Sequence, residues 1–231
     1  MRKIEAVVFD MDGVLIDSEV LWRQVREEFA ADLGLVWGEV DQASTMGAST
    51  AMWARIMVER LQLRHRLGMD EGGVAKEIIG RMRAKYAEHL PEREGAIQAV
   101  RLAASRYKVA LASGSPNELA EYVLRVTGLN QVFQATMYGD DVEYGKPAPD
   151  IYWHVLAKLG VKPENAVGVE DSGNGIKSLK AAGMGIIAAP GPEFPLAPEV
   201  LAMADVHIQE MTQFSLELIE QLGGGPRRVR V

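Results

Sequence analysis

Short apolar runs alternate with helix-patterned segments along most of this 231-residue chain, and this alternation constrains the fold most strongly. The runs are nearly continuous stretches of apolar residues, as in strands that are buried on both faces of a parallel sheet. The segments between them repeat their apolar residues every three to four positions, which is the spacing of an amphipathic helix. The sequence therefore predicts an α/β fold in which helices cover both faces of a parallel sheet.

The expected elements can be placed by residue number. We expect strands at 4–9, 109–112, 166–169 and 185–189, a weaker strand at 133–137 and an edge strand at 204–208. We expect helices between them at 95–106, 116–127, 149–159, 174–182 and 212–222. Gly128, Gly160 and Gly183 follow three of these helices, where a left-handed C-cap favours glycine.

The stretch 18–91 breaks the alternation, because it has no convincing strand pattern. It is typical of helices instead, at 19–33, 50–63 and 73–89. We therefore predict a discontinuous core domain at 1–17 and 92–222, an inserted all-helical domain at 18–91 and a flexible tail at 223–231. The two polar connections between the parts, near Asp17 and near Pro91, are candidate hinges.

Composition and charge narrow the class of protein. The net charge is −7, which argues against nucleic acid as a partner because a phosphate-binding face needs basic excess. The chain has no cysteine and no apolar stretch near the roughly 18 residues of a membrane span. We expect a cytoplasmic protein without a membrane contact and with no protein partner implied. A small phosphorylated ligand stays possible, since it needs only one or two cations.

Two aspartates follow the first strand, at Asp10 and Asp12, with Gly13 next. Residues two apart at a strand end face the same side, so both carboxyls can converge on one ligand. The carboxyl ends of parallel strands are where open α/β sheets bind ligands. The alternative is a simple turn in which the aspartates cap backbone groups.

The next strand end carries a hydroxyl group and free amides. Ser113 ends a strand, and Ser115 and Glu118 have capping-box spacing around a helix that begins with Pro116. Ser113 and the amides of Gly114 and Ser115 would then point off a helix N-terminus, which is a ready anion site. A plain capped helix is the alternative.

Two further segments add a cation and two acids. Lys146 precedes a proline-rich turn, where its ammonium could reach a phosphate or simply lie in solvent. Glu170 and Asp171 end an apolar strand before a glycine-rich turn, and such acids would repel a dinucleotide pyrophosphate. They suit Mg²⁺, which takes carboxylates, waters and substrate phosphate as ligands. Together the four strand ends predict Mg²⁺-assisted phosphoryl transfer with a carboxylate nucleophile.

These four segments, in this order, resemble the four motifs of the haloacid dehalogenase superfamily. The segments are FDMDGVLIDSE, ASGSP, GKPAPDIY and VEDSGNGIKSLKAAG. The resemblance runs from Ile4 to about Leu222 and is closest to the phosphatase and phosphomutase branch with an inserted helical cap. It implies a Rossmann-like core, which agrees with the predicted strands and helices.

The resemblance also implies roles. Asp10 would attack phosphorus and form an aspartyl phosphate, and Asp12 would act as general acid and then general base. Mg²⁺ would be held by Asp10, the Asp12 carbonyl and Asp171, with Glu170 in or near the shell. The transferring phosphoryl group would be bound by three further residues, Ser113, Gly114 and Lys146.

The cap favours a phosphatase over a β-phosphoglucomutase-like enzyme. Trp22 stands where such mutases have histidine, and residues 46–50 lack their basic stretch, so no cation for a second phosphate is evident. Trp22 could form an apolar wall over the substrate or belong to the core, and Glu19 could face the site or cap its helix. We thus expect a phosphatase acting on sugar or polyol phosphates. The alternatives are a sugar phosphomutase and a non-catalytic phosphate-binding regulator.

Overall fold

The computed structural model describes residues 3–45 and 48–223. These residues form a six-stranded sheet in the order β3-β2-β1-β4-β5-β6, and every pairing between neighbours is parallel. The strands are β1 (Ala6–Phe9), β2 (Lys108–Ser113), β3 (Ala135–Tyr138), β4 (Ala166–Glu170), β5 (Gly185–Ala188) and β6 (Val206–His207). The predicted parallel α/β fold is therefore confirmed, including its weak strand and its short edge strand.

Strand β1 lies at the centre of the sheet. Phe9, its last residue, lies opposite Leu111 of β2 and Val169 of β4. Its side chains alternate between the faces: Val7 and Phe9 join one apolar cluster, and Ala6 and Val8 join the other. Burial on both faces explains why the strand is an unbroken apolar run.

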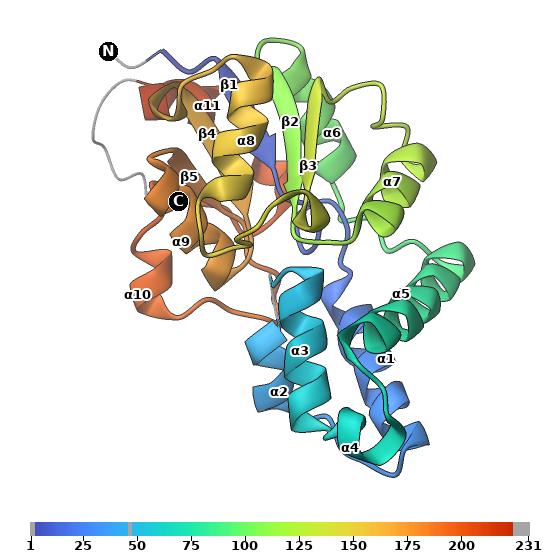
Figure 1. Cartoon of the computed structure of the whole chain (residues 1–231). Coiled ribbons are helices and arrows are strands. Elements are labelled where there is room, and N and C mark those ends of the chain that lie inside the picture. Colours follow the sequence, from blue (N-terminus) through green and yellow to red (C-terminus); the bar gives the residue numbers. More distant parts are fainter. Residues whose placement is uncertain (1–2, 46–47, 224–231) are drawn as a thin grey trace.

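Six helices flank the sheet, as Figure 1 shows. They are α6 (Ala96–Ala104), α7 (Asn117–Val126), α8 (Asp150–Leu159), α9 (Gly173–Ala182), α10 (Pro198–Leu201) and α11 (Leu216–Gly223). One apolar cluster contains side chains of α6, α7 and α11, and the other contains side chains of α8, α9 and α10. Three short 3₁₀ turns, at Gly139–Asp141, Pro163–Asn165 and Met211–Gln213, complete the described core.

The described part of the stretch 18–91 contains helices joined by loops, and no strand. It comprises α1 (Glu19–Asp32), α2 (Glu39–Thr45), α3 (Thr50–Arg60), α4 (Leu63–Leu67) and α5 (Glu71–Glu88). These helices form a group beside the sheet, in the lower half of Figure 1. Helix α2 was not expected, and the single helix expected at 50–63 is divided because Gln62 has a left-handed φ of 53°.

Two other expectations concern the ends of elements. The helix expected at 212–222 begins later, at Leu216, after a 3₁₀ turn. Residues 224–231 of the expected tail lie outside the described residues. No helix in the described part of the chain has both the length and the hydropathy of a membrane span.

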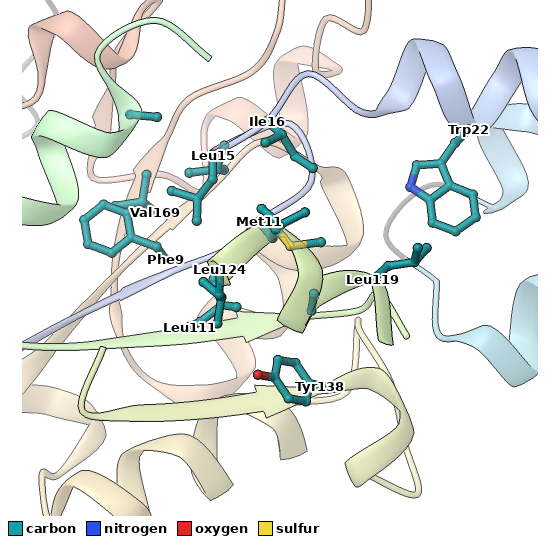
Figure 2. Packing of buried hydrophobic residues seen from close by; sticks show 14 of the residues in the cluster. Phe9, Met11, Leu15, Ile16, Trp22, Leu111, Leu119, Leu124, Tyr138 and Val169 are labelled. Carbon is teal, nitrogen blue, oxygen red and sulfur yellow. The ribbon is translucent and has the colours of Figure 1, made fainter. Parts of the chain in front are cut away.

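The chain turns tightly after β1. The carbonyl of Met11 accepts hydrogen bonds from the amides of Val14, Leu15 and Ile16. The side chains of this turn are apolar and fully buried, and Figure 2 shows Leu15 and Ile16 beside Met11. The turn is therefore fixed by both backbone and packing, so that Asp10 and Asp12 stand on a rigid base.

The two connections to the helical segment lie side by side. The amide of Asp17 donates to the carbonyl of Pro91 at 2.8 Å, and the amide of Arg93 donates to the carbonyl of Leu15 at 3.0 Å. The Arg93 side chain also donates to the carbonyls of Gly13 and, at 2.6 Å, Ala189. The entry and exit of the helical segment thus form one short, paired junction.

Candidate active site

The register of the sheet brings the predicted site residues to one edge. Asp10 follows Phe9, whose neighbours Leu111 and Val169 lie near the ends of β2 and β4. The strand ends at Ser113 and Glu170 therefore flank Asp10. This is the carboxyl edge of a parallel sheet, on either side of its central strand, where such sheets bind ligands.

Lys146 reaches into this edge from the loop before α8. Its Nζ lies 2.8 Å from Asp10 Oδ1, 2.6 Å from Glu170 Oε1 and 3.1 Å from the Ala112 carbonyl. The side chain is buried, so the alternative of a solvated lysine is wrong. Burial lowers the pKa of Lys146, but the two carboxylates outweigh it and hold the pKa well above its ordinary value.

Three carboxylates lie together beside this ammonium. Ligand atoms of Asp10, Glu170 and Asp171 all lie within 4.8 Å of one another, and all three side chains are buried. Burial, together with the neighbouring carboxylate of Glu170, raises the pKa values of Asp10 and Asp171 well above the ordinary value of an aspartate. Two like charges at this spacing repel by about 3–4 kcal/mol at an effective dielectric near 20.

Glu170 is held in place by many donors. Its Oε1 accepts from Lys146 and, at 3.0 Å, from the Tyr152 hydroxyl. Its Oε2 accepts from the amides of Asp171 and Ser172 and from the Ser172 hydroxyl, at 3.0–3.1 Å. By contrast, Asp171 has no ion pair within 4 Å among the described residues. The cluster as a whole thus carries more negative charge than Lys146 balances.

Two glycines allow the backbone to approach these acids closely. A Cβ at Gly13, whose φ is +72°, would lie 1.9 Å from Asp171 Oδ2. A Cβ at Gly175 would lie 1.8 Å from Glu170 Oε1. Any larger residue would displace a carboxylate, so both glycines serve the shape of the acid cluster. Oxygen donors in such a cradle fit a hard divalent cation.

Asp12 lies apart from the acid cluster and is surrounded by donors. Its Oδ1 accepts from the Ser18 hydroxyl at 2.6 Å and from Trp22 Nε1 at 3.1 Å. Its Oδ2 accepts from the hydroxyls of Ser115 at 2.6 Å and Ser113 at 3.3 Å. Asp10 and Asp12 are therefore chemically distinct, because one meets an ammonium and acids while the other meets neutral donors.

The predicted capping box at α7 is wrong. Helix α7 begins at Asn117 after Pro116 as N-cap, and no side chain caps it from that position. Ser115 turns its hydroxyl to Asp12 instead, and Asp140 accepts from the Asn117 amide at 3.2 Å. Ser113 accepts from the Ser115 amide at 3.0 Å, so its oxygen is fixed at the strand end.

These residues surround a small cavity of about 30 Å³ between the sheet edge and the helical segment. Its core side includes Asp10, Asp12, Gly114, Ser115, Lys146, Asp171 and Ser172. Its other side consists of Glu19, Trp22, Arg26, Thr45, Ala48 and Trp53 from the helical segment. Ser113 and Glu170 do not line it but support residues that do. The two residues expected from α1, Glu19 and Trp22, thus both reach the cavity.

The structure decides between the alternatives left open for the two α1 residues, Glu19 and Trp22. Trp22 is buried and packs against the Trp53 ring at 5.8 Å, but it also donates to Asp12, so it is more than an apolar wall. Burial and the nearby Asp12 raise the pKa of Glu19 to about 7, against the opposing effect of Arg26. No capping hydrogen bond from a side chain is present at this end of α1.

Sequence reasoning missed several residues of the site, among them Ser18 and Arg26, and it assigned the Ser115 hydroxyl to a helix cap instead of to Asp12. No cation was expected at position 22 or in the stretch 46–50, but the cap supplies one elsewhere, because Arg26 lines the cavity. Helical spacing is the signal that could have found it, since Arg26 stands four residues after Trp22 on the same face. Residues 46 and 47, in the stretch compared with the mutases, lie outside the described residues.

Comparison with known proteins assigns the family. A family model described as haloacid dehalogenase-like hydrolase matches residues 4–183, which include β1 to β4 and every site residue above. The chain is thus a hydrolase with a parallel α/β core. It belongs to the haloacid dehalogenase-like hydrolases, which confirms the resemblance seen in its four motifs.

Two relatives and one solved structure are similar over most of the chain. Hexitol phosphatase B of Escherichia coli (strain K12) is 34% identical over 216 residues, covering 93% of this chain and 96% of that protein. A phosphorylated carbohydrates phosphatase of Thermotoga maritima is 35% identical, covering 78% and 82%. The structure of β-phosphoglucomutase from Clostridium difficile has a TM-score of 0.82 at 22% identity, covering 95% and 96%, and shows the shared fold.

Proposed function

We propose that this protein is a Mg²⁺-dependent phosphatase that hydrolyses monophosphates of sugars or polyols. The observation that carries the proposal is the separation of the two aspartates. Asp10 lies 2.8 Å from Lys146 within a buried acid cluster, whereas Asp12 lies outside it among hydroxyl and indole donors. A nucleophile and a proton-transfer group need such different surroundings. The names of the two relatives supply the substrate class.

The chemistry proceeds in two displacements on phosphorus. A carboxylate oxygen of Asp10 attacks the phosphoryl group, and the bond to the ester oxygen breaks while that oxygen takes a proton from Asp12. A water molecule then attacks the aspartyl phosphate and gives its proton to Asp12, which releases inorganic phosphate and restores Asp10. Covalent catalysis of this kind divides one difficult step into two easier ones.

Phosphate binding falls to three groups at the sheet edge. Lys146 offers a fixed positive charge, Ser113 a hydroxyl and Gly114 a backbone amide. Ser113 and Gly114 lie at the end of β2, whose position the sheet register determines, and Lys146 reaches this edge from the loop before α8. A rigid arrangement of donors stabilises the charge of the transition state without reorganisation.

Mg²⁺ fits the residues present. Asp10, Asp171 and the Asp12 main-chain carbonyl would hold the ion, and Glu170 would lie in or near its shell. The buried acid cluster, with Asp171 lacking an ion pair among the described residues, supports a divalent cation there. The bound ion would neutralise the carboxylates and thereby let a phosphate dianion approach Asp10.

We infer a two-domain organisation in which residues 1–17 and 92–222 form the core and residues 18–91 form a mobile cap. The cavity of about 30 Å³ holds little more than one or two water molecules. A sugar phosphate is far larger, so the cap has to open for substrate entry and product release. The paired connections at Asp17–Pro91 and Leu15–Arg93 support a hinge at that junction.

Hydrolysis of p-nitrophenyl phosphate tests the proposal. We expect turnover that needs Mg²⁺, stops with EDTA and is lost in Asp10→Asn. With a sugar phosphate, free inorganic phosphate is the expected product. An isomerised sugar phosphate without phosphate release would establish a phosphomutase instead. Turnover that survives EDTA or Asp10→Asn would contradict the mechanism, and the absence of any turnover would favour a non-catalytic phosphate-binding protein.

A further inference from the structure

Arg26 is a buried cation that the proposed chemistry does not use. It lies on α1 with 3% of its surface exposed, and its guanidinium carbon lies 4.9 Å from the Trp22 ring centre and 5.6 Å from that of Trp53. Its Nη1 donates to Gln42 Oε1 at 3.1 Å, and the same oxygen accepts from Trp37 Nε1 at 3.2 Å. Arg26 is therefore held in one orientation by two rings and an amide.

The guanidinium of Arg26 has donor capacity to spare. Its Nε has no hydrogen-bond partner, and no carboxylate forms an ion pair with it, as far as the described residues extend. A buried donor without a partner is costly, so proteins rarely retain one without a use. Burial lowers the pKa of Arg26 to about 10, which still leaves the group charged at neutral pH. A ligand with acceptor oxygens would satisfy this cation.

The position of Arg26 indicates which part of the substrate it would contact. Arg26 lines the same cavity as Asp12 and Lys146, on the opposite, cap side. The phosphoryl group meets Lys146, so the part of the substrate that is not transferred faces the cap. Arg26 thus stands where the carbon chain beyond the ester oxygen has to lie.

The neighbours of Arg26 indicate the chemistry of that chain. The cap wall also contains the carboxyl group of Glu19, the hydroxyl of Thr45 and the ring of Trp53. A second phosphate would face Glu19 as well as Arg26, which is unfavourable when Glu19 is ionised. Hydroxyl groups both donate and accept, so they suit a wall with a cation, a carboxyl and a hydroxyl. The ring offers an apolar face to the carbons between them.

We propose that Arg26 is a specificity-determining residue that donates to hydroxyl oxygens of the substrate's carbon chain, which makes uncharged polyol chains the preferred leaving groups. This inference rests on the proposed function and deepens it. It assigns the substrate class to one cap residue and predicts that bisphosphates are poorer substrates than monophosphates.

The test compares three substrates of equal chain length: a hexitol 6-phosphate, hexyl phosphate without hydroxyls, and a hexitol 1,6-bisphosphate. For the wild type we expect kcat/KM to be highest for the hexitol monophosphate. In Arg26→Gln, the ratio of kcat/KM for hexitol phosphate to that for hexyl phosphate should fall by about tenfold or more. Arg26→Lys retains the charge without the planar fork and should lie between the two.

The controls separate specificity from stability. Arg64→Gln removes another cap arginine, which is exposed and paired with Glu71 away from the cavity, and should leave the ratio unchanged. If Arg26→Gln does not fold, the wild-type comparison of hexitol and hexyl phosphates still decides the point. An unchanged ratio in folded Arg26 variants, equal wild-type use of both monophosphates, or a preference for the bisphosphate would overturn the inference. Failure of the wild type to hydrolyse p-nitrophenyl phosphate would overturn the proposed function itself.

Discussion

Trp22 Nε1 lies 3.1 Å from Asp12 Oδ1, and this hydrogen bond joins the helical segment to the sheet edge. Ser18 makes a second such link at 2.6 Å. The other two residues that donate to Asp12 are Ser113 and Ser115, and both belong to the core. The environment of Asp12 therefore depends on where the helical segment stands, so opening of the cap would remove half of its donors.

Trp22→Phe tests this link. The substitution removes the indole N–H but retains a ring beside Trp53 and Arg26. A hydrogen bond contributes about 0.5–1.5 kcal/mol net, so we expect kcat/KM for phosphomonoesters to fall by about two- to tenfold. Trp153→Phe is the matched control, because it removes a hydrogen bond to Ala182 on the core surface. Equal activity in both variants would contradict a role for Trp22 in orienting Asp12.

Lys146→Met should destabilise the fold strongly. It leaves the buried carboxylates of Asp10 and Glu170 without their ion pair, and the loss of one partner of a buried pair costs about 3–5 kcal/mol. Urea unfolding at pH 7 without Mg²⁺ measures the change. Lys158→Met should change stability by less than about 0.5 kcal/mol, since Lys158 is exposed. A small effect at Lys146 would mean that the cluster is protonated rather than charged.

Mg²⁺ should stabilise the folded protein through Asp171. At a concentration of about 100 times its dissociation constant, an ion that binds only the folded state adds about 2.7 kcal/mol. Thermal unfolding with and without Mg²⁺ should show this increase for the wild type and little of it for Asp171→Asn. Glu143→Gln, an exposed carboxylate in the loop before Lys146, should retain the full increase. The same increase in Asp171→Asn would exclude Asp171 as a ligand.

Gly175→Ala should disturb the acid cluster although alanine favours helices. Its Cβ would lie 1.8 Å from Glu170 Oε1, and overpacking of this kind costs about 1–3 kcal/mol. Gly80→Ala in α5 has no heavy atom within 4 Å of the new Cβ and should stabilise by up to about 1 kcal/mol. Chemical denaturation of both variants gives the comparison. A stabilised Gly175→Ala would show that Glu170 can move freely.

Glu19 should make stability depend on pH. Its pKa is raised from 4.5 to about 7 in the folded state by burial and by Asp12, so the folded protein retains a proton that the unfolded chain has lost. The stability of the metal-free wild type relative to Glu19→Gln should therefore fall as pH rises from about 4.5 to 7 and then become constant. Denaturant unfolding curves of both proteins at several pH values measure this difference in the free energy of unfolding. A difference that does not vary with pH would place Glu19 in a solvated position.

The fold was largely predictable because its two sequence patterns, apolar runs for strands and three-to-four spacing for helices, are both local. A buried parallel strand such as β1 has apolar residues on both faces, so its apolar residues are consecutive in the sequence. Errors arose where tertiary contacts decide. Ser115 had the spacing of a helix cap, but its hydroxyl turned to Asp12, a residue more than 100 positions away.

The residues of the candidate site likewise fall into two groups, one predictable from the sequence and one decided by tertiary packing. The sequence by itself placed Asp10 and Asp171 at the sheet edge, because strand ends follow directly from the order of strands, and it left Lys146 open between the site and solvent. Only the tertiary structure decided which cap residues meet them. Arg26 and Trp22 share a helix face, but the orientation of that face depends on how α1 packs across the cavity. Spacing along the chain does not encode how distant segments pack, so only the packing of α1 against the core places the Arg26 cation opposite Lys146.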